Sequence, residues 1–139
     1  MASGPSTRSQ KLKRLVAVQR HLEKMADYEL AATVRHRAEV SQSMDEVIEA
    51  IGSADPVHRP FAMHYAERFG RLTAKERQLA GIQQMQENKV LRERTKGDRL
   101  EDNMKEAREL EDREAADNAI YDLIELTLAS PASSKLRSS

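Results

Sequence analysis

The side chains that most often bind metals or act as nucleophiles are sparse in this 139-residue chain. Its four histidines are His21, His36, His58 and His64, and no two of them lie four residues apart. A zinc-binding pair on one helix face needs that spacing, as in the H-E-x-x-H motif, which the sequence lacks. Cysteine is absent, so thiolate metal ligands and disulfides are excluded. We expect neither a metal site nor a cofactor.

Carboxylate groups are plentiful, but they gather in one acidic stretch. Glu109, Glu111 and Asp112 lie close enough in sequence to suggest general acid–base catalysis. Their neighbours are also charged, however, and such a run is typical of a solvated helix face. The sequence contains no glycine-rich phosphate loop and no G-x-S-x-G nucleophile motif. We therefore predict a protein that is not an enzyme.

A basic stretch is the best polar candidate for a contact with another protein. It reads Lys89-Val-Leu-Arg92-Glu-Arg94-Thr-Lys96. Two interpretations are open, because the same residues suit either a partner-binding surface or the solvated flank of a coiled coil. On the first interpretation, the contacts are made by Lys89, Arg92 and Arg94.

The composition narrows the class of protein further. Only 39% of the residues are hydrophobic and 4% aromatic, whereas 33% are charged, which favours an elongated body with much wet surface. The 23 basic and 23 acidic residues give a net charge of zero, which argues against nucleic acid as a ligand. No run approaches the roughly 18 apolar residues of a membrane span. We expect a cytoplasmic protein that is at most peripheral to a membrane.

Apolar residues at helical spacing extend over most of the chain, with one interruption near Gly52 and Pro56. This pattern predicts an all-α fold, an antiparallel two-helix coiled-coil hairpin with a longer second helix. The helices are expected at about 9–51 and 61–129, the turn at about 52–60, and disordered tails at 1–8 and 130–139. The first apolar stripe consists of Leu12, Leu15, Leu22, Ala26, Leu30 and Val34, continued by Val40, Met44, Val47, Ile48 and Ile51. The second consists of Phe61, Tyr65, Phe69, Leu72, Leu79, Ile82 and Met85, continued by Leu100, Met104, Ala107, Leu110, Ile120, Leu123 and Ile124.

Two details of the chain path stay open in the sequence. Asp55 followed by Pro56 suits an N-cap and first helical position, but Pro60 suits a first turn equally well. Gly97 precedes Asp-Arg-Leu-Glu, which resembles a capping box, so residues 98–129 have the alternative of folding back as a third helix.

The expected turn fixes an expected register. Leu30 should lie near Ile82, and the second helix should outrun the first over residues 102–129. Residues 98–125 hold eleven acids and four bases, whereas residues 1–22 hold five bases and no acid, and this contrast favours the same register. The uncovered apolar residues of the overhang would then associate with a second copy, fold back or bind a partner. The partner-binding candidates there are Met104, Leu110 and Leu123.

Three aromatic residues lie four apart at the start of the second helix. Phe61, Tyr65 and Phe69 would either dock into another protein or close the hairpin by packing on Met44, Ile48 and Ile51. The structural interpretation is favoured.

The segment Lys11-Leu-Lys-Arg-Leu-Val-Ala-Val-Gln-Arg-His-Leu-Glu-Lys-Met-Ala-Asp-Tyr-Glu-Leu-Ala-Ala resembles the first helix of the FliJ/YscO family of bacterial type III export. The likeness rests on a basic start, spaced leucines and a closing Glu-Leu-Ala-Ala, and it extends loosely over residues 10–128 in length and layout. It implies an antiparallel coiled coil similar to the two-helix stalk of the rotary ATPase gamma subunit.

The resemblance also implies a function and partners. The chain would be a non-enzymatic stalk or escort component of flagellar protein export that binds the export ATPase, export-gate proteins or export chaperones. The alternative is a self-associating coiled-coil structural or adaptor protein, in which residues 102–129 pair between copies.

Overall fold

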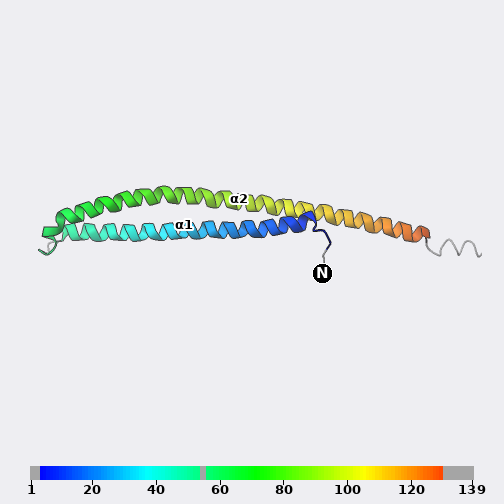
Figure 1. Cartoon of the computed structure of the whole chain (residues 1–139), viewed down its shortest axis with the longest axis horizontal. Coiled ribbons are helices and arrows are strands. Elements are labelled where there is room, and N and C mark those ends of the chain that lie inside the picture. Colours follow the sequence, from blue (N-terminus) through cyan, green and yellow to red (C-terminus); the bar gives the residue numbers. More distant parts are fainter. Residues whose placement is uncertain (1–3, 54–55, 130–139) are drawn as a thin grey trace, which may run out of the picture. The chain divides into compact units, whose positions relative to one another are not determined.

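The computed structural model describes residues 4–53 and 56–129, and its regular elements are all helical (Figure 1). Helix α1 spans Arg8–Gly52, a short 3₁₀ helix η1 spans Arg59–Phe61, and helix α2 spans Ala62–Ala129. No strand occurs among these described residues. The predicted all-α class with a longer second helix is confirmed. The proposed cap at Asp55 and the tail at 130–139 lie outside the described residues.

The chain divides into two compact units. The first, here called the hairpin unit, is Gln19–Gly97, and the second, the terminal unit, combines Met1–Val18 with Asp98–Ser139. In the hairpin unit, residues 19–52 of α1 lie antiparallel beside residues 62–97 of α2 (Figure 1). In the terminal unit, the first turns of α1 lie beside the part of α2 that follows residue 97.

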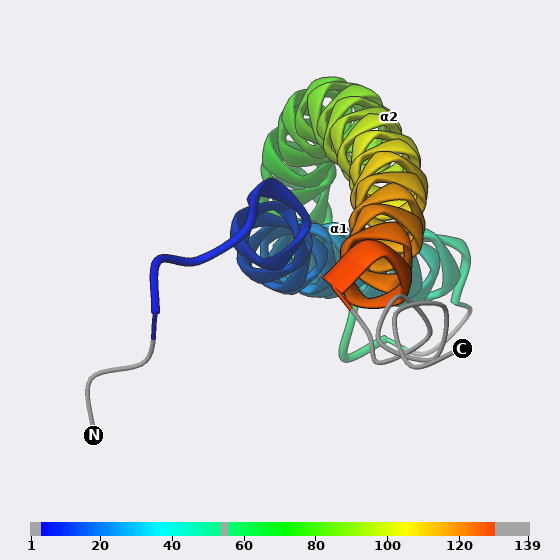
Figure 2. The same cartoon turned by 90° about the vertical axis from the view of Figure 1, so that its right-hand side faces the viewer.

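Helix α1 begins at Arg8 because the preceding residues cap it. The backbone N–H of Gln10 donates to Oγ1 of Thr7 at 3.3 Å, and the Thr7 N–H donates to Oε1 of Gln10 at 3.1 Å. This reciprocal pair is a capping box, which satisfies N–H groups that lack a partner in the first turn. Residues 4–6 lead away from the helix (Figure 2). Arg14 nevertheless donates to the Ser6 hydroxyl at 2.6 Å, so Ser6–Arg8, placed in the expected disordered tail, take part in the start of the fold.

The connection between the helices is organised by Pro60 and a histidine. Pro60 lies in the first turn of η1, and the Phe61 N–H donates to the His58 carbonyl at 3.2 Å. Nδ1 of His58 shares a hydrogen bond of 2.9 Å with the Tyr65 hydroxyl. Phe61 is 48% exposed and contacts the rings of His64 and Tyr65. Tyr65, together with Phe69, is half-buried, as the favoured closing role requires. The expected partners Ile48 and Ile51 remain about half exposed, whereas Met44 is half-buried.

Helix α2 continues without a break through Gly97, so the alternative of a third helix folding back is not realised. Gly97 is buried, and its backbone faces the Arg20 side chain. The glycine therefore marks a close approach between helices rather than a helix end.

The helices of the hairpin unit meet along two seams in which the spacing alternates between three and four residues. This is the heptad pattern of a coiled coil, but polar residues occupy about half of the positions. The α1 seam is Gln19, Glu23, Ala26, Leu30, Thr33, Arg37, Val40, Met44 and Val47. The α2 seam is Tyr65, Phe69, Leu72, Glu76, Leu79, Gln83, Gln86, Val90, Glu93 and Gly97.

Several leucines assigned to the core stripes lie on the surface instead. Leu15 is 52% exposed, Leu22 is 42% exposed, and Val34 is also exposed. On α2, Met85 is 71% exposed, and Leu110 is exposed as well. Val16 and Glu23, each one residue after an exposed leucine, are half-buried. The stripe predicted from leucine spacing therefore lies on the helix face next to the one that packs against α2. The face that is buried instead contains polar seam residues, such as Gln19 and Arg37, that form hydrogen bonds to α2.

The observed register differs from the expected one. Lys89 contacts Glu29 at 3.3 Å, and Arg94 lies 3.9 Å from Asp27, so Leu30 lies closer to the level of Lys89 than to Ile82. The difference is about one helical turn. The connection between the helices includes η1, and α2 begins at Ala62.

The terminal unit shows how far α2 remains covered. Ser9 is buried, and its backbone N–H donates to Oε1 of Glu111 at 2.9 Å. Ala107 is also buried and Met104 is half-buried, whereas every residue of 112–129 is exposed. The uncovered part of α2, called the overhang, is therefore residues 112–129 and not the expected 102–129. Met104 was wrongly assigned to the uncovered part.

Candidate protein-binding surfaces

A polar cluster lies inside the seam of the hairpin unit. Nε and Nη2 of Arg37 donate to the Glu76 carboxylate at 2.9 and 2.5 Å, and Nη1 donates to Oε1 of Gln83 at 2.8 Å. The hydrogen bond to Glu76 raises the pKa of Arg37, which is therefore a fixed positive charge. Oε2 of Glu76 is buried without a hydrogen-bond partner. The cluster fixes which residues face each other, but its ionised groups already contact one another and leave no site for a ligand.

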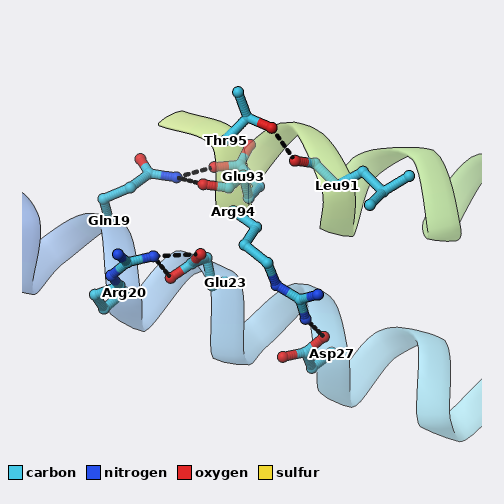
Figure 3. Close-up of polar contacts among 8 residues, drawn as sticks. All are labelled: Gln19, Arg20, Glu23, Asp27, Leu91, Glu93, Arg94 and Thr95. Atoms are coloured by element: carbon cyan, nitrogen blue, oxygen red, sulfur yellow. Dashed lines mark hydrogen bonds and ion pairs between the residues drawn. The ribbon is translucent and has the colours of Figure 1, made fainter. Parts of the chain in front are cut away.

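A second polar contact joins the helices near the end of the hairpin unit (Figure 3). Nε2 of Gln19 donates to the Glu93 carbonyl at 2.9 Å and to its carboxylate at 2.5 Å. The Gln19 hydrogen bond, with a smaller contribution from Lys96, holds the pKa of Glu93 below its usual value. Glu93 is therefore an ionised hydrogen-bond acceptor at neutral pH, which suits a structural role.

The predicted basic surface is not a single surface. Lys89 and Arg94 reach across to acidic residues of α1, Glu29 and Asp27, and so contribute to the register (Figure 3 shows Arg94). Arg92 forms no ion pair with a described residue and points to a hollow on α2. Of the three predicted residues, Arg92 is the one whose charge is left for a partner.

The hollow beside Arg92 encloses about 630 Å³ and is open to solvent. Its apolar part comes from Ile82 and Met85, which the sequence assigned to the core. Its basic part comes from Lys89 and Arg92, and Gln86 and Asn88 complete the lining. The hollow therefore presents an apolar end followed by a basic end along one helix. Met85 is 71% exposed and faces outward, whereas Ile82 is half-buried.

The overhang is apolar and acidic at once. Its charged residues are five acids and Arg113. Six large apolar side chains are exposed along it: Ile120, Tyr121, Leu123, Ile124, Leu126 and Leu128. A helix with this much unburied apolar surface is typical of a protein-binding segment. The predicted residue Leu123 lies here, and Leu110 lies just before it, also exposed.

The six predicted binding residues thus separate into two groups. Lys89, Arg92 and Arg94 belong to the hairpin unit, and Met104, Leu110 and Leu123 belong to the terminal unit. Met104 is half-buried and is therefore less accessible to a partner than the other five.

Other kinds of site find little support in the described residues 4–53 and 56–129. No three histidine or acidic side chains there converge as metal ligands would. Neither helix contains, within that part of the chain, an apolar stretch that would cross a lipid bilayer.

Comparison of the chain with models of protein families, with curated proteins and with solved structures yields no match.

Proposed function

We propose that this protein acts without catalysis, as a coiled-coil stalk or escort component of bacterial flagellar type III protein export. Its partners would be the export ATPase and export-gate proteins, or export chaperones. The observation that carries the proposal is a hairpin of two long helices whose second helix continues into an exposed apolar segment. The resemblance of residues 11–32 to the FliJ/YscO family supplies the biological setting.

The surfaces of the hairpin unit support binding rather than chemistry. The half-buried polar groups Arg37 and Glu93 are engaged in hydrogen bonds between the helices. The exposed groups are single charges and apolar side chains on helix faces, which suit helix–helix recognition. A cytoplasmic location follows from this proposal, because the ATPase and the chaperones act there.

The experiment measures binding of the purified full chain to the purified export ATPase and to the cytoplasmic part of the export gate from the same organism. A chain that ends at residue 111 is the matched variant, because it keeps the buried Ala107 and the Glu111 contact to Ser9. We expect the full chain to bind at least one partner and the shorter chain to lose a binding step. Absence of binding to both partners would contradict the export proposal.

A self-associating structural or adaptor protein is the second candidate. The six exposed apolar residues of the overhang favour it, since such a surface is buried by association in water. The concentration dependence of the molecular mass separates it from a protein that binds foreign partners alone.

A further inference from the structure

Helix α2 carries a second heptad stripe beside the seam of the hairpin unit, here called the outer stripe, in which four residues are exposed and Ile82 is half-buried. The stripe starts with two apolar residues and continues with three basic ones, at spacings of three, four, three and four residues. Its first four residues also line the hollow described above. The outer stripe is Ile82, Met85, Lys89, Arg92 and Lys96.

The overhang carries a stripe with the opposite order of chemistry. Two acidic residues come first, an aromatic residue follows, and two apolar residues end it, again at spacings of three, four, three and four. All five side chains are exposed, and Leu128 is 76% exposed. The overhang stripe is Glu114, Asp117, Tyr121, Ile124 and Leu128.

The two stripes match each other in the antiparallel direction. Met85 then faces Ile124, and Arg92 faces Asp117, so that apolar residues meet apolar ones and opposite charges pair. In the parallel direction, Met85 would face Asp117 and Arg92 would face Ile124. That arrangement would place a carboxylate and a guanidinium against apolar side chains, at a cost in desolvation.

We propose that the outer stripe of one copy binds the overhang stripe of a second copy, as an antiparallel helix pair. The proposal goes beyond the export function and does not depend on it. The ion pairs that residues of the outer stripe already form are weak, so binding a second copy would disrupt little. Lys89 is 3.3 Å from Glu29, and Lys96 is 3.5 Å from Glu93, and all but Glu93 of these groups are well exposed. Exposed ion pairs of this kind contribute little to stability, so exchanging them costs little. Lys96 would then face Glu114 of the second copy, and Lys89 would face Tyr121.

The strength of the contact follows from its size. One antiparallel pair of about four turns buries less than about 1,200 Å², which places it among weak and transient interfaces. Two copies that exchange both stripes bury this area twice and form a closed dimer, whereas one-way contacts would join copies in a row. Association is therefore expected at concentrations on the order of 10 µM.

The test exchanges the charges of one pair. Arg92→Glu and Asp117→Arg are prepared as separate full-length variants, and sedimentation equilibrium measures the mass of each from about 1 to about 100 µM. Wild type is expected to associate, and each variant alone is expected to lose at least about tenfold in association constant, because like charges then face each other. An equal mixture of the two variants is expected to associate like wild type, since in the mixed pair residue 92 of each copy faces an opposite charge at residue 117 of the other.

The mixture distinguishes association from a fold-back within one chain. A variant with both substitutions would restore an internal contact, but a mixture of single variants would not. Arg77→Glu is the control, because it makes the same charge change outside the outer stripe, and it should associate like wild type. A wild-type chain that stays monomeric, or single variants that fail to restore each other in the mixture, would overturn the proposal. Circular dichroism of each variant checks that helix content is unchanged.

Discussion

The Arg20 guanidinium lies against the backbone of α2 at Gly97, so closely that a Cβ at this glycine would be 2.6 Å from Nη1 of Arg20. Glu23 holds the guanidinium there through an ion pair of 2.8 Å (Figure 3). The glycine that might have ended the second helix instead makes room for a charged side chain between the helices.

This relationship predicts different effects for two glycine substitutions. Gly81→Ala meets open space and should raise the free energy of unfolding by about 1 kcal/mol through helix propensity. Gly97→Ala should gain roughly half of that, because Arg20 must move and its ion pair with Glu23 is weakened. Urea denaturation of both variants measures the difference. A loss of more than about 1 kcal/mol at Gly97 would show that the helices cannot accommodate even a flexible rearrangement of Arg20.

We expect the charged residues of the seam to fix the alignment of the two helices while lowering the stability of the fold. Arg37→Leu alone should lower the thermal midpoint, because the Glu76 carboxylate then loses its hydrogen bonds inside the seam. The double substitution of Arg37 and Glu76 to leucine should raise the midpoint above that of wild type, since two apolar heptad positions replace an ion pair. Thermal unfolding followed by circular dichroism compares the three variants with wild type. A double variant less stable than the single variant would contradict this expectation.

Acid should weaken the contact between Ser9 and Glu111. The Ser9 hydroxyl and backbone N–H both donate to the Glu111 carboxylate and lower its pKa below the usual value. A carboxyl group with a lowered pKa stabilises the fold fully above its ordinary pKa, and the contribution is lost as the pH falls through the lowered pKa. An NMR titration should therefore give Glu111 a pKa below that of an exposed glutamate. In Ser9→Ala, which removes one donor, the pKa should move part of the way back. An unchanged Glu111 pKa in that variant would rule out the hydroxyl as its cause.

The overhang should exchange its amide hydrogens faster than the seam. Every residue of 112–129 is exposed, whereas Val40 and Val47 are buried between the helices. Local opening therefore costs less free energy in the overhang. Hydrogen exchange at about 1 µM, below the concentration of the proposed association, measures it, and the overhang should become more protected as the concentration rises. Protection equal to that of the seam at low concentration would mean that the overhang is already covered.

The fold could be read from the sequence because long apolar periodicity and one glycine–proline break suffice for two helices. The faces could not be read in the same way. Leu22 and Val34 extend a plausible apolar stripe, but the buried positions include Gln19 and Thr33. Apolar spacing does not reveal such polar residues: Gln19 hydrogen-bonds across the helices to Glu93, and the Thr33 hydroxyl donates to the Glu29 carbonyl within its own helix.

The binding surfaces were predictable in part. Arg92 and Leu123 were correctly placed on accessible surface, because a basic stretch and an apolar end stand out in the sequence. Met85 was expected in the apolar core stripe but is 71% exposed, because its position depends on which helix face is buried. The extent of the overhang could not be predicted in this way, because it depends on the register and on the contact of Ser9 with Glu111.

The most direct test of the export function is the amount of flagellar filament protein exported by a strain of the source organism that lacks this gene. Export should fall sharply in that strain, return with the full chain, and stay low with the chain that ends at residue 111. Unimpaired export without the gene, or a source organism without a type III export apparatus, would contradict the proposal.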